Sequence, residues 1–145
     1  MSISGQNLSI VIVTLKSENI IDQCLKSIDQ NIPVIVIENS DNQKFKDQLE
    51  SKYKNLKCIL SNSNLGMGAA NNIGIKKAKT DFVLILNPDV VLEKNTLTEL
   101  FLSSNQFPNF SIMAPLETKF PNYGMTYQKH FVRPLKNTNE NKNLP

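Results

Sequence analysis

The stretch that decides the fold is LSIVIVT, residues Leu8–Thr14, a run of mostly apolar, β-branched side chains. Continuous rather than alternating hydrophobicity is typical of a strand covered on both faces, as in parallel sheets. The pattern returns downstream, strongly at residues 34–37 and Phe82–Leu86 and more weakly at Leu56–Leu60. We therefore predict four strands of a sheet that is covered on both faces.

Apolar side chains at helical spacing follow each strand, at residues 20–28, 45–53, 69–78 and 95–106. In the third stretch the predicted buried stripe is Ala69, Ala70, Ile73 and Ala78. Ser17 is a plausible N-cap for the first helix, and Thr96-x-x-Glu99 has the pattern of a capping box for the fourth. The order β-α-β-α-β-α-β-α, joined by right-handed crossovers, predicts an α/β fold of three layers, α/β/α, with a mainly parallel sheet.

A chain of 145 residues fits a single domain. We assign residues 1–115 to a binding core, with a short fifth strand at 112–114. Residues 116–145 are predicted to be an irregular C-terminal segment ending in a disordered tail. The net charge of +3 is too small to argue for a nucleic-acid partner, and none is expected.

Cys24 and Cys58 are the only cysteines and lie in apolar patterns, which predicts buried free thiols and a reducing compartment. The N-terminus shows no apolar signal region, and no stretch reaches the roughly 18 apolar residues of a membrane span. We therefore expect a cytoplasmic protein. Aromatic residues interleaved with basic ones after residue 119 fit contact with the inner face of the membrane, contact with a partner protein, or an irregular domain end.

Ligands of open α/β sheets bind at the carboxyl ends of the strands, and all four predicted ends here are polar. The densest pattern is NSNLGMGAANNIG at residues 62–74. Its glycines let backbone approach a ligand closely, and a helix N-terminus there would offer N–H groups to a diphosphate. A small-residue helix packed tightly on the sheet explains the same pattern equally well. Gly66-x-Gly68 with Asp89 downstream also partly matches a dinucleotide fingerprint, although Asn71 replaces its third small residue.

Two carboxylates follow predicted strands. Asn87-Pro88-Asp89 ends the run Phe82–Leu86, because proline removes a ladder donor. Asp89 could hold a divalent metal that bridges a diphosphate, or it could belong to a solvated Asx turn. Glu38 could accept hydrogen bonds from a base and a ribose, or it could be an exposed acid beside a turn.

Four stretches in order resemble glycosyltransferase family two, of the GT-A fold, and particularly its rhamnosyltransferase-like members. They are SIVIVT at residues 9–14, VIVIENS at 34–40, the 62–74 stretch, and FVLILNPD at 82–89. The resemblance covers about residues 7–115, and the last two stretches together are its most specific part. It implies a nucleotide-diphospho-sugar transferase-like core that is truncated on the C-terminal side.

By this resemblance, Thr14 and Glu38 line a nucleoside pocket. The stretch carrying Asn64, Gly66, Asn71 and Asn72 lies along the donor, and Asn87 and Asp89 take the Asp-x-Asp position, with Asp89 on Mg²⁺ or Mn²⁺. Three positions depart from the family pattern: Asn87 replaces the first Asp, Glu38 stands where Asp is usual, and Lys16 replaces an aromatic residue that stacks on the base.

The activity implied is transfer of a sugar from a UDP- or dTDP-sugar to a glycan or lipid-linked acceptor in surface polysaccharide synthesis. The family's general base falls beyond the last residue of this sequence, and no catalytic residue is assigned. Glu93, Glu99, Glu117 and His130 remain as acid–base groups, and none matches the family's base. The alternative is a non-catalytic nucleotide-binding remnant or partner subunit, with a partner chain supplying the missing half.

Overall fold

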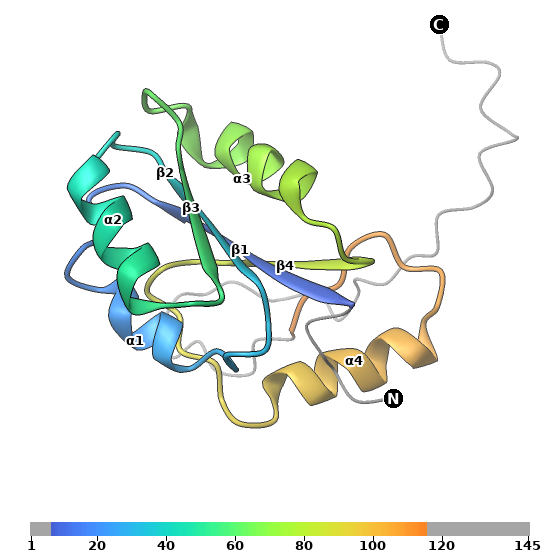
Figure 1. The fold of residues 1–145 in the computed structure, drawn as a ribbon. Coiled ribbons are helices and arrows are strands. Elements are labelled where there is room, and N and C mark those ends of the chain that lie inside the picture. Colours follow the sequence, from blue (N-terminus) through green and yellow to red (C-terminus); the bar gives the residue numbers. More distant parts are fainter. Residues whose placement is uncertain (1–6, 116–145) are drawn as a thin grey trace, which may run out of the picture. The chain divides into compact units, whose positions relative to one another are not determined.

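Four strands form one parallel sheet in the computed structural model, which describes residues 7–115 (Figure 1). β1 (Leu8–Thr14), β2 (Val34–Glu38), β3 (Leu56–Leu60) and β4 (Phe82–Leu86) lie in the order β3-β2-β1-β4. Their register places Thr14 opposite Glu38, so the carboxyl ends of neighbouring strands meet at one edge of the sheet. The predicted strands and their parallel pairing are confirmed.

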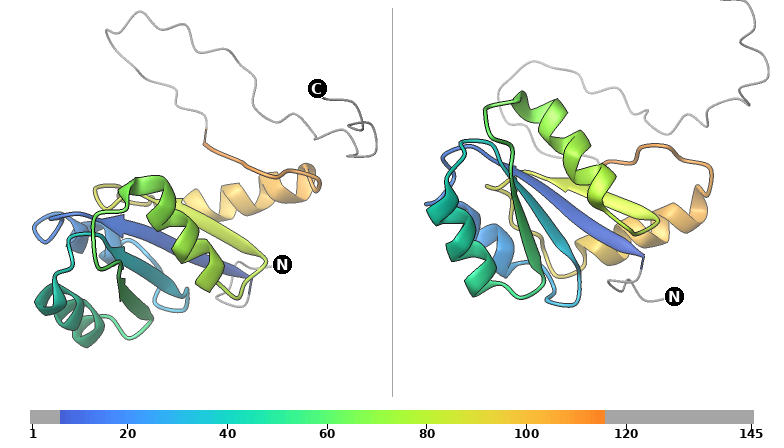
Figure 2. Two further views of the ribbon diagram at one scale, coloured as in Figure 1. Left: turned by 90° about the horizontal axis from the view of Figure 1, so that it is seen from above. Right: turned by 45° about the horizontal axis from the view of Figure 1, so that its top comes forward.

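Helices cover both faces of this sheet. α1 (Ile21–Lys26) and α2 (Gln43–Lys52) lie on one face, and α3 (Gly66–Lys77) lies on the other (Figure 2). Each helix connects two parallel strands, which is why the chain must cross a face of the sheet between them. The predicted three-layer arrangement is therefore confirmed.

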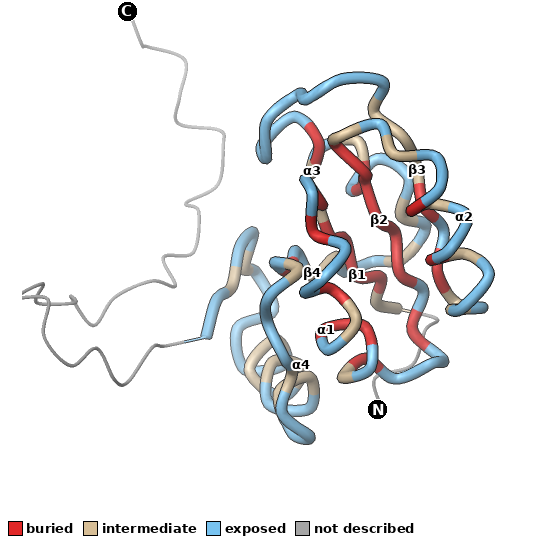
Figure 3. Tube along the Cα trace, turned by 90° about the vertical axis from the view of Figure 1, so that its left-hand side faces the viewer, coloured by how far each residue is buried: buried red, intermediate tan, exposed pale blue. Residues whose placement is uncertain are grey.

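The two central strands supply most of the core. β1 and β2 are buried almost throughout, as Figure 3 shows. On the α3 side, Val11 clusters with Ile35, Ile37 and Ala70. Because side chains alternate along a strand, the fully buried Ile10 and its neighbours at even positions face the α1 and α2 side.

β4 differs from the central strands, although its sequence is just as apolar. Phe82 is 37% exposed and Ile85 48% exposed. The expectation that both faces of this strand are covered is therefore wrong within the described residues, where β4 lies at an edge of the sheet. The expected fifth strand is also wrong, because residues 112–114 form no strand.

Two predicted helix starts need correction. α1 begins after Ile20, and the Ser17 hydroxyl bonds to the backbone of Leu15 instead of capping the helix. The fourth helix, α4 (Thr96–Gln106), has Asn95 as its N-cap, with no side-chain capping bond. Thr96 already lies inside the first turn, so the predicted capping box with Glu99 does not form.

The chain divides into two units between Lys94 and Asn95. The first contains the sheet with α1, α2 and α3, and the second contains α4. The predicted core boundary at residue 115 stays a prediction, and the predicted C-terminal segment at 116–145 lies outside the described residues. Within residues 7–115, no helix is both long and apolar enough to cross a membrane.

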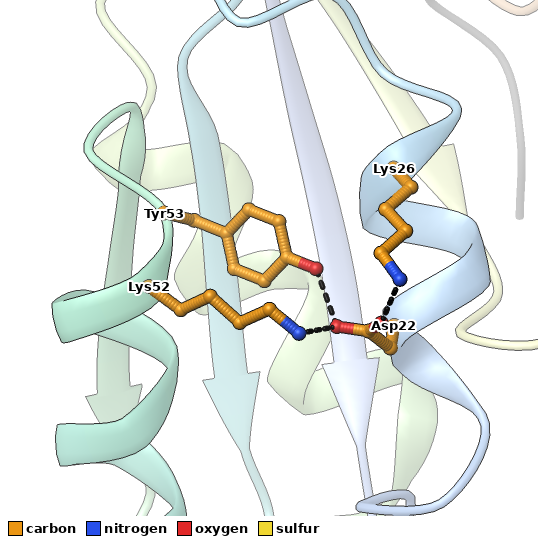
Figure 4. A network of polar contacts seen from close by, with 4 residues as sticks. All are labelled: Asp22, Lys26, Lys52 and Tyr53. Atoms are coloured by element: carbon orange, nitrogen blue, oxygen red, sulfur yellow. Dashed lines mark hydrogen bonds and ion pairs between the residues drawn. The ribbon is translucent and has the colours of Figure 1, made fainter.

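A polar network ties α1 to the end of α2 (Figure 4). Asp22 pairs with Lys26 of its own helix at 2.7 Å and also with Lys52. The Tyr53 hydroxyl donates to Asp22 Oδ1 at 2.5 Å. Hydrogen bonds from both lysines and from the tyrosine hold the pKa of Asp22 well below its ordinary value. Burial, followed by the bond to Asp22, raises the pKa of Tyr53 to about 12.

Both cysteines are buried free thiols, as expected. Burial raises the pKa of Cys24 to about 11, and the charge of Asp89 adds to the effect. Burial likewise raises the pKa of Cys58 to about 12, with a further contribution from Glu50. Neither thiol is therefore ionised near neutral pH.

Candidate functional site

A pocket of about 410 Å³ opens at the carboxyl edge of the sheet. Its polar lining residues are Ser17, Asn39, Asn64, Asn87 and Asp89. Its apolar lining residues are Val13, Leu15, Ile20, Met67 and Pro88. The volume lies in the range of about 300 to 1,000 Å³ that is usual for small-molecule sites. The predicted site edge thus carries a cavity built from four separate strand ends.

A larger cavity, of about 880 Å³, lies towards the amino-terminal half of the sheet. Lys46, Lys57, Lys77 and Lys79 stand around it, and Ile35 is among its apolar residues. We place the functional site in the smaller pocket because parallel α/β sheets bind ligands at the carboxyl ends of their strands.

The end of β4 forms one wall of the pocket. Asn87 and Asp89 are both exposed there, on either side of Pro88. The Val90 N–H donates to the Asn87 carbonyl at 3.2 Å, which closes a turn around the proline. The Cys24 thiol of α1 donates to the same carbonyl at 3.6 Å. The Asp89 carboxylate is therefore presented to solvent from a backbone turn that α1 braces.

The glycine-rich loop forms another wall, which consists of Asn64, Gly66 and Met67. Gly66 has φ +76°, a left-handed conformation that glycine adopts without steric cost. A Cβ added at Gly66 or Gly68 would meet no other atom within 4 Å. α3 starts here without a side-chain cap, so its first-turn N–H groups after Gly66 have no intrahelical acceptor. This half of the stretch leaves room for a ligand beside a helix N-terminus.

The second half of the same stretch serves packing. Ala70 and Gly74 are the buried residues of α3. A Cβ at Gly74 would overlap Val11 Cγ1 and lie 3.1 Å from its Cγ2. Ala69, which was expected in the buried stripe, is exposed, because the face turned to the sheet is set by Ala70 and Gly74. The tight-packing interpretation of residues 62–74 thus holds for the second half, and ligand binding by the first half stays a prediction.

Asn39 is a site residue that the sequence analysis did not single out. It is 2% exposed, follows Glu38 at the end of β2, and reaches the glycine-rich loop. Its Nδ2 donates to Asn64 Oδ1 at 2.9 Å, and its Oδ1 accepts from the Leu65 N–H at 3.0 Å and the Ser61 hydroxyl at 2.9 Å. Its position in the polar run after β2 was the one available signal.

Thr14 and Glu38 are fully buried and do not line the pocket. The Glu38 carboxylate accepts hydrogen bonds from its own loop: from the Ser40 N–H at 3.1 Å, the Ser40 hydroxyl at 2.5 Å and the Asn42 N–H at 2.6 Å. The Thr14 hydroxyl donates to the Ile37 carbonyl at 3.4 Å. Glu38 is thus not the exposed acid of the alternative interpretation, and its contact with a nucleoside stays a prediction.

The remaining predicted donor residues lie further along α3. Asn71 Oδ1 is buried, and no hydrogen-bond donor among the described residues reaches it, whereas Asn72 is exposed. Neither lines the pocket. Among the acid–base groups, Glu93 and Glu99 are exposed, while Glu117 and His130 lie outside the described residues.

The side chains at the end of β4, Asn87 and Asp89, are compatible with a divalent metal only if a bound ligand supplies further coordinating oxygens. Within residues 7–115, no three His, Cys, Asp or Glu side chains are grouped to hold an ion. Mg²⁺, however, commonly takes one or two protein carboxylates together with phosphate oxygens and water. Asp89, exposed on the pocket wall beside Asn87, meets that requirement.

Comparison with protein families gives a match to the model described as Glycosyl transferase family 2, over residues 9–144. A curated relative is the low-salt glycan biosynthesis hexosyltransferase Agl10 of Haloferax volcanii. It is 31% identical over 113 residues, which are 75% of this chain and 36% of the relative. An uncharacterized glycosyltransferase of Haemophilus influenzae is 29% identical over 97 residues, 62% of this chain and 39% of its own.

Two solved structures are similar to this chain in fold and sequence. The S. aureus TarS 1-349 structure superposes with a TM-score of 0.59 at 27% identity, over 69% of this chain and 32% of that one. A second TarS structure gives the same score at 25% identity and covers 20% of its chain. The chain thus spans between a third and two fifths of the length of the curated relatives it matches.

Proposed function

Because the chain belongs to glycosyl transferase family 2, we propose that its carboxyl-edge pocket binds the diphosphate and sugar of a UDP- or dTDP-sugar. The reaction served is transfer of that sugar to a glycan or lipid-linked acceptor in surface polysaccharide synthesis. One observation carries the proposal: the open start of α3 at Gly66 and the exposed Asp89 carboxylate face one pocket from two strand ends.

The two walls are chemically complementary to a metal–diphosphate. A helix N-terminus carries a partial positive charge and unpaired N–H groups, which favour phosphate oxygens. A carboxylate on the β4 wall favours a Mg²⁺ or Mn²⁺ ion, which in turn binds the same diphosphate. Such an ion would stabilise the departing diphosphate. Asn64 and Asn87, one from each wall, supply amide groups for the hydroxyls of a sugar or ribose.

The test is calorimetric titration of the chain with UDP-glucose and dTDP-rhamnose, with and without Mn²⁺ or Mg²⁺. We expect metal-dependent binding that Asp89→Ala abolishes. Asp81→Ala is the matched control, because Asp81 is an exposed carboxylate just before the opposite end of β4. If the wild-type chain showed no metal-dependent nucleotide binding, the proposal would be refuted.

A turnover assay separates the enzyme from the alternative of a non-catalytic binding module or partner subunit. Donor hydrolysis or transfer by the chain supports the enzyme, whereas binding without turnover supports the module. A partner chain that completes the protein, and a location in the cytoplasm or at the inner face of the membrane, stay predictions. Co-purification and cell fractionation check them.

A further inference from the structure

The side chain of Asn39 is buried beside the pocket and both its donor and its acceptor are bonded to protein groups. Its backbone N–H donates to the Thr14 carbonyl at 2.8 Å, which fixes Asn39 to the end of β1. Its amide then reaches from β2 to the loop that follows β3, where it meets Ser61, Asn64 and Leu65. A single buried residue thereby connects three strand ends, through its backbone to β1 and through its side chain to the loop after β3.

Asn64 depends on this connection for its orientation. It is exposed, so packing does not hold it, yet its Oδ1 accepts from both Asn39 Nδ2 at 2.9 Å and the Gly66 N–H at 3.0 Å. The bond from Gly66 is local, whereas the bond from Asn39 ties Asn64 to the sheet. Without Asn39, the Asn64 side chain retains only a contact within its own loop.

The loop backbone also needs an external support. Asn62 has φ 62° and Gly66 has φ 76°, so two left-handed residues lie within five positions. For asparagine this conformation carries a steric cost that other contacts must offset. The Leu65 N–H, between them in sequence, donates to Asn39 Oδ1. Burying the Asn39 amide without hydrogen-bond partners would cost free energy. The loop conformation that supplies those partners is therefore favoured over other conformations of the loop.

We propose that Asn39 is a positioning residue that sets Asn64 and the start of α3 in the donor-binding arrangement. The inference rests on the proposed function of the pocket. It assigns Asn39 an effect on donor affinity that is transmitted through Asn64 and the Leu65 N–H. The amide of Asn39 already forms hydrogen bonds with protein groups, so its contribution to donor binding is indirect.

Asn39→Ala tests the inference, with Asn55→Ala as its matched control. The Asn55 amide also links two loops, because it donates to the Ile32 carbonyl at 2.8 Å. These loops precede β2 and β3, so they lie at the end of the sheet away from the pocket. We expect Asn39→Ala to weaken binding of UDP-glucose or dTDP-rhamnose roughly ten-fold or more, and Asn55→Ala to leave it unchanged. Equal affinities of the two variants would overturn the inference.

The route through Asn64 is tested by combining Asn39→Ala with Asn64→Ala. If Asn39 acts through Asn64, the double variant loses clearly less affinity than the product of the two single losses. Losses that multiply would overturn the route. Should Asn39→Ala fail to fold, Asn39→Asp keeps the shape and the oxygen that accepts from Leu65, and replaces the donor to Asn64 with a carboxylate oxygen that cannot donate.

Amide hydrogen exchange gives a readout that needs no ligand. Exchange at Leu65 and Gly66 should accelerate in Asn39→Ala and not in Asn55→Ala. Unchanged exchange at these amides would refute the positioning role even if affinity fell. If the wild-type chain bound neither nucleotide sugar, the proposed function would fail, while the exchange comparison would still decide whether Asn39 holds the loop.

Discussion

Gly74→Ala is expected to destabilise the fold, although alanine is the better helix former. In an exposed helix the change would add about 1 kcal/mol of stability. Here the new methyl group overlaps Val11 Cγ1 and lies within 3.3 Å of Val11 Cβ. Val11 is fully buried in β1, with Ile35, Ile37 and Ala70 around it, so it cannot turn away. Overpacking of this kind costs about 1 to 3 kcal/mol.

The contact involves three atoms of a fully buried β-branched side chain, so the upper end of that range applies. After the helix-propensity gain, the net loss is about 2 kcal/mol. For a domain of this size, that corresponds to a fall in Tm on the order of 10 °C. Urea and thermal unfolding followed by circular dichroism measure both quantities.

Two variants make the reasoning refutable. Gly68→Ala lies in the same helix with no atom within 4 Å, so it should leave stability unchanged or raise it slightly. In a Val11→Ala background, Gly74→Ala should lose most of its cost, because the opposing methyl groups are gone. If Gly74→Ala proved as stable as Gly68→Ala, α3 would not approach β1 as closely as described.

Three further outcomes are expected. Asp22→Asn should destabilise the chain at neutral pH, and its difference from wild type should shrink as pH falls below about 4. The reason is that the folded state lowers the pKa of Asp22. The charged carboxylate therefore stabilises the fold at pH values above its unfolded-state pKa, and this stabilisation is lost as the pH falls and the folded carboxylate is protonated. Unfolding curves measured across pH check this. Cys24 and Cys58 should resist a thiol reagent at pH 8 in the native chain and react once the chain is unfolded, because burial raises the pKa of both thiols. Titration with a chromogenic disulfide checks this. Rapid labelling of the native chain would contradict it. Glu38→Ala should cost about 1 to 3 kcal/mol in denaturant unfolding, because it removes the charged acceptor of the partly buried donors of its own loop. Full stability would show that those donors find other acceptors.

The strands were predictable because their signal is local and redundant. Leu8–Thr14 is mostly and Phe82–Leu86 entirely apolar or β-branched, and the structure gives these bounds. Burial was harder to predict, since Phe82 and Ile85 are exposed despite the same apolar pattern. Composition tells which residues prefer a strand, whereas coverage of a strand depends on which elements pack against it.

The pocket was predictable at the level of strand ends and less so at the level of contacts. Asn64, Gly66, Asn87 and Asp89 were expected at the site and line one pocket. Asn39 was not singled out because its partners lie 22 to 26 positions away in the sequence. No local spacing reveals a hydrogen bond across two strand ends.

The division of residues 62–74 has a consequence for redesigning donor specificity. Asn64, Gly66 and Met67 line the pocket, and the space beside Gly66 and Gly68 is open. Ala70 and Gly74, one and two turns later, are fixed by contact with the sheet. A mutant library confined to Asn64 and Met67 would sample ligand preference at less risk to folding, because Gly66 is held as glycine by its φ of +76°. A library that included Ala70 and Gly74 would be filtered by solubility before any activity screen began.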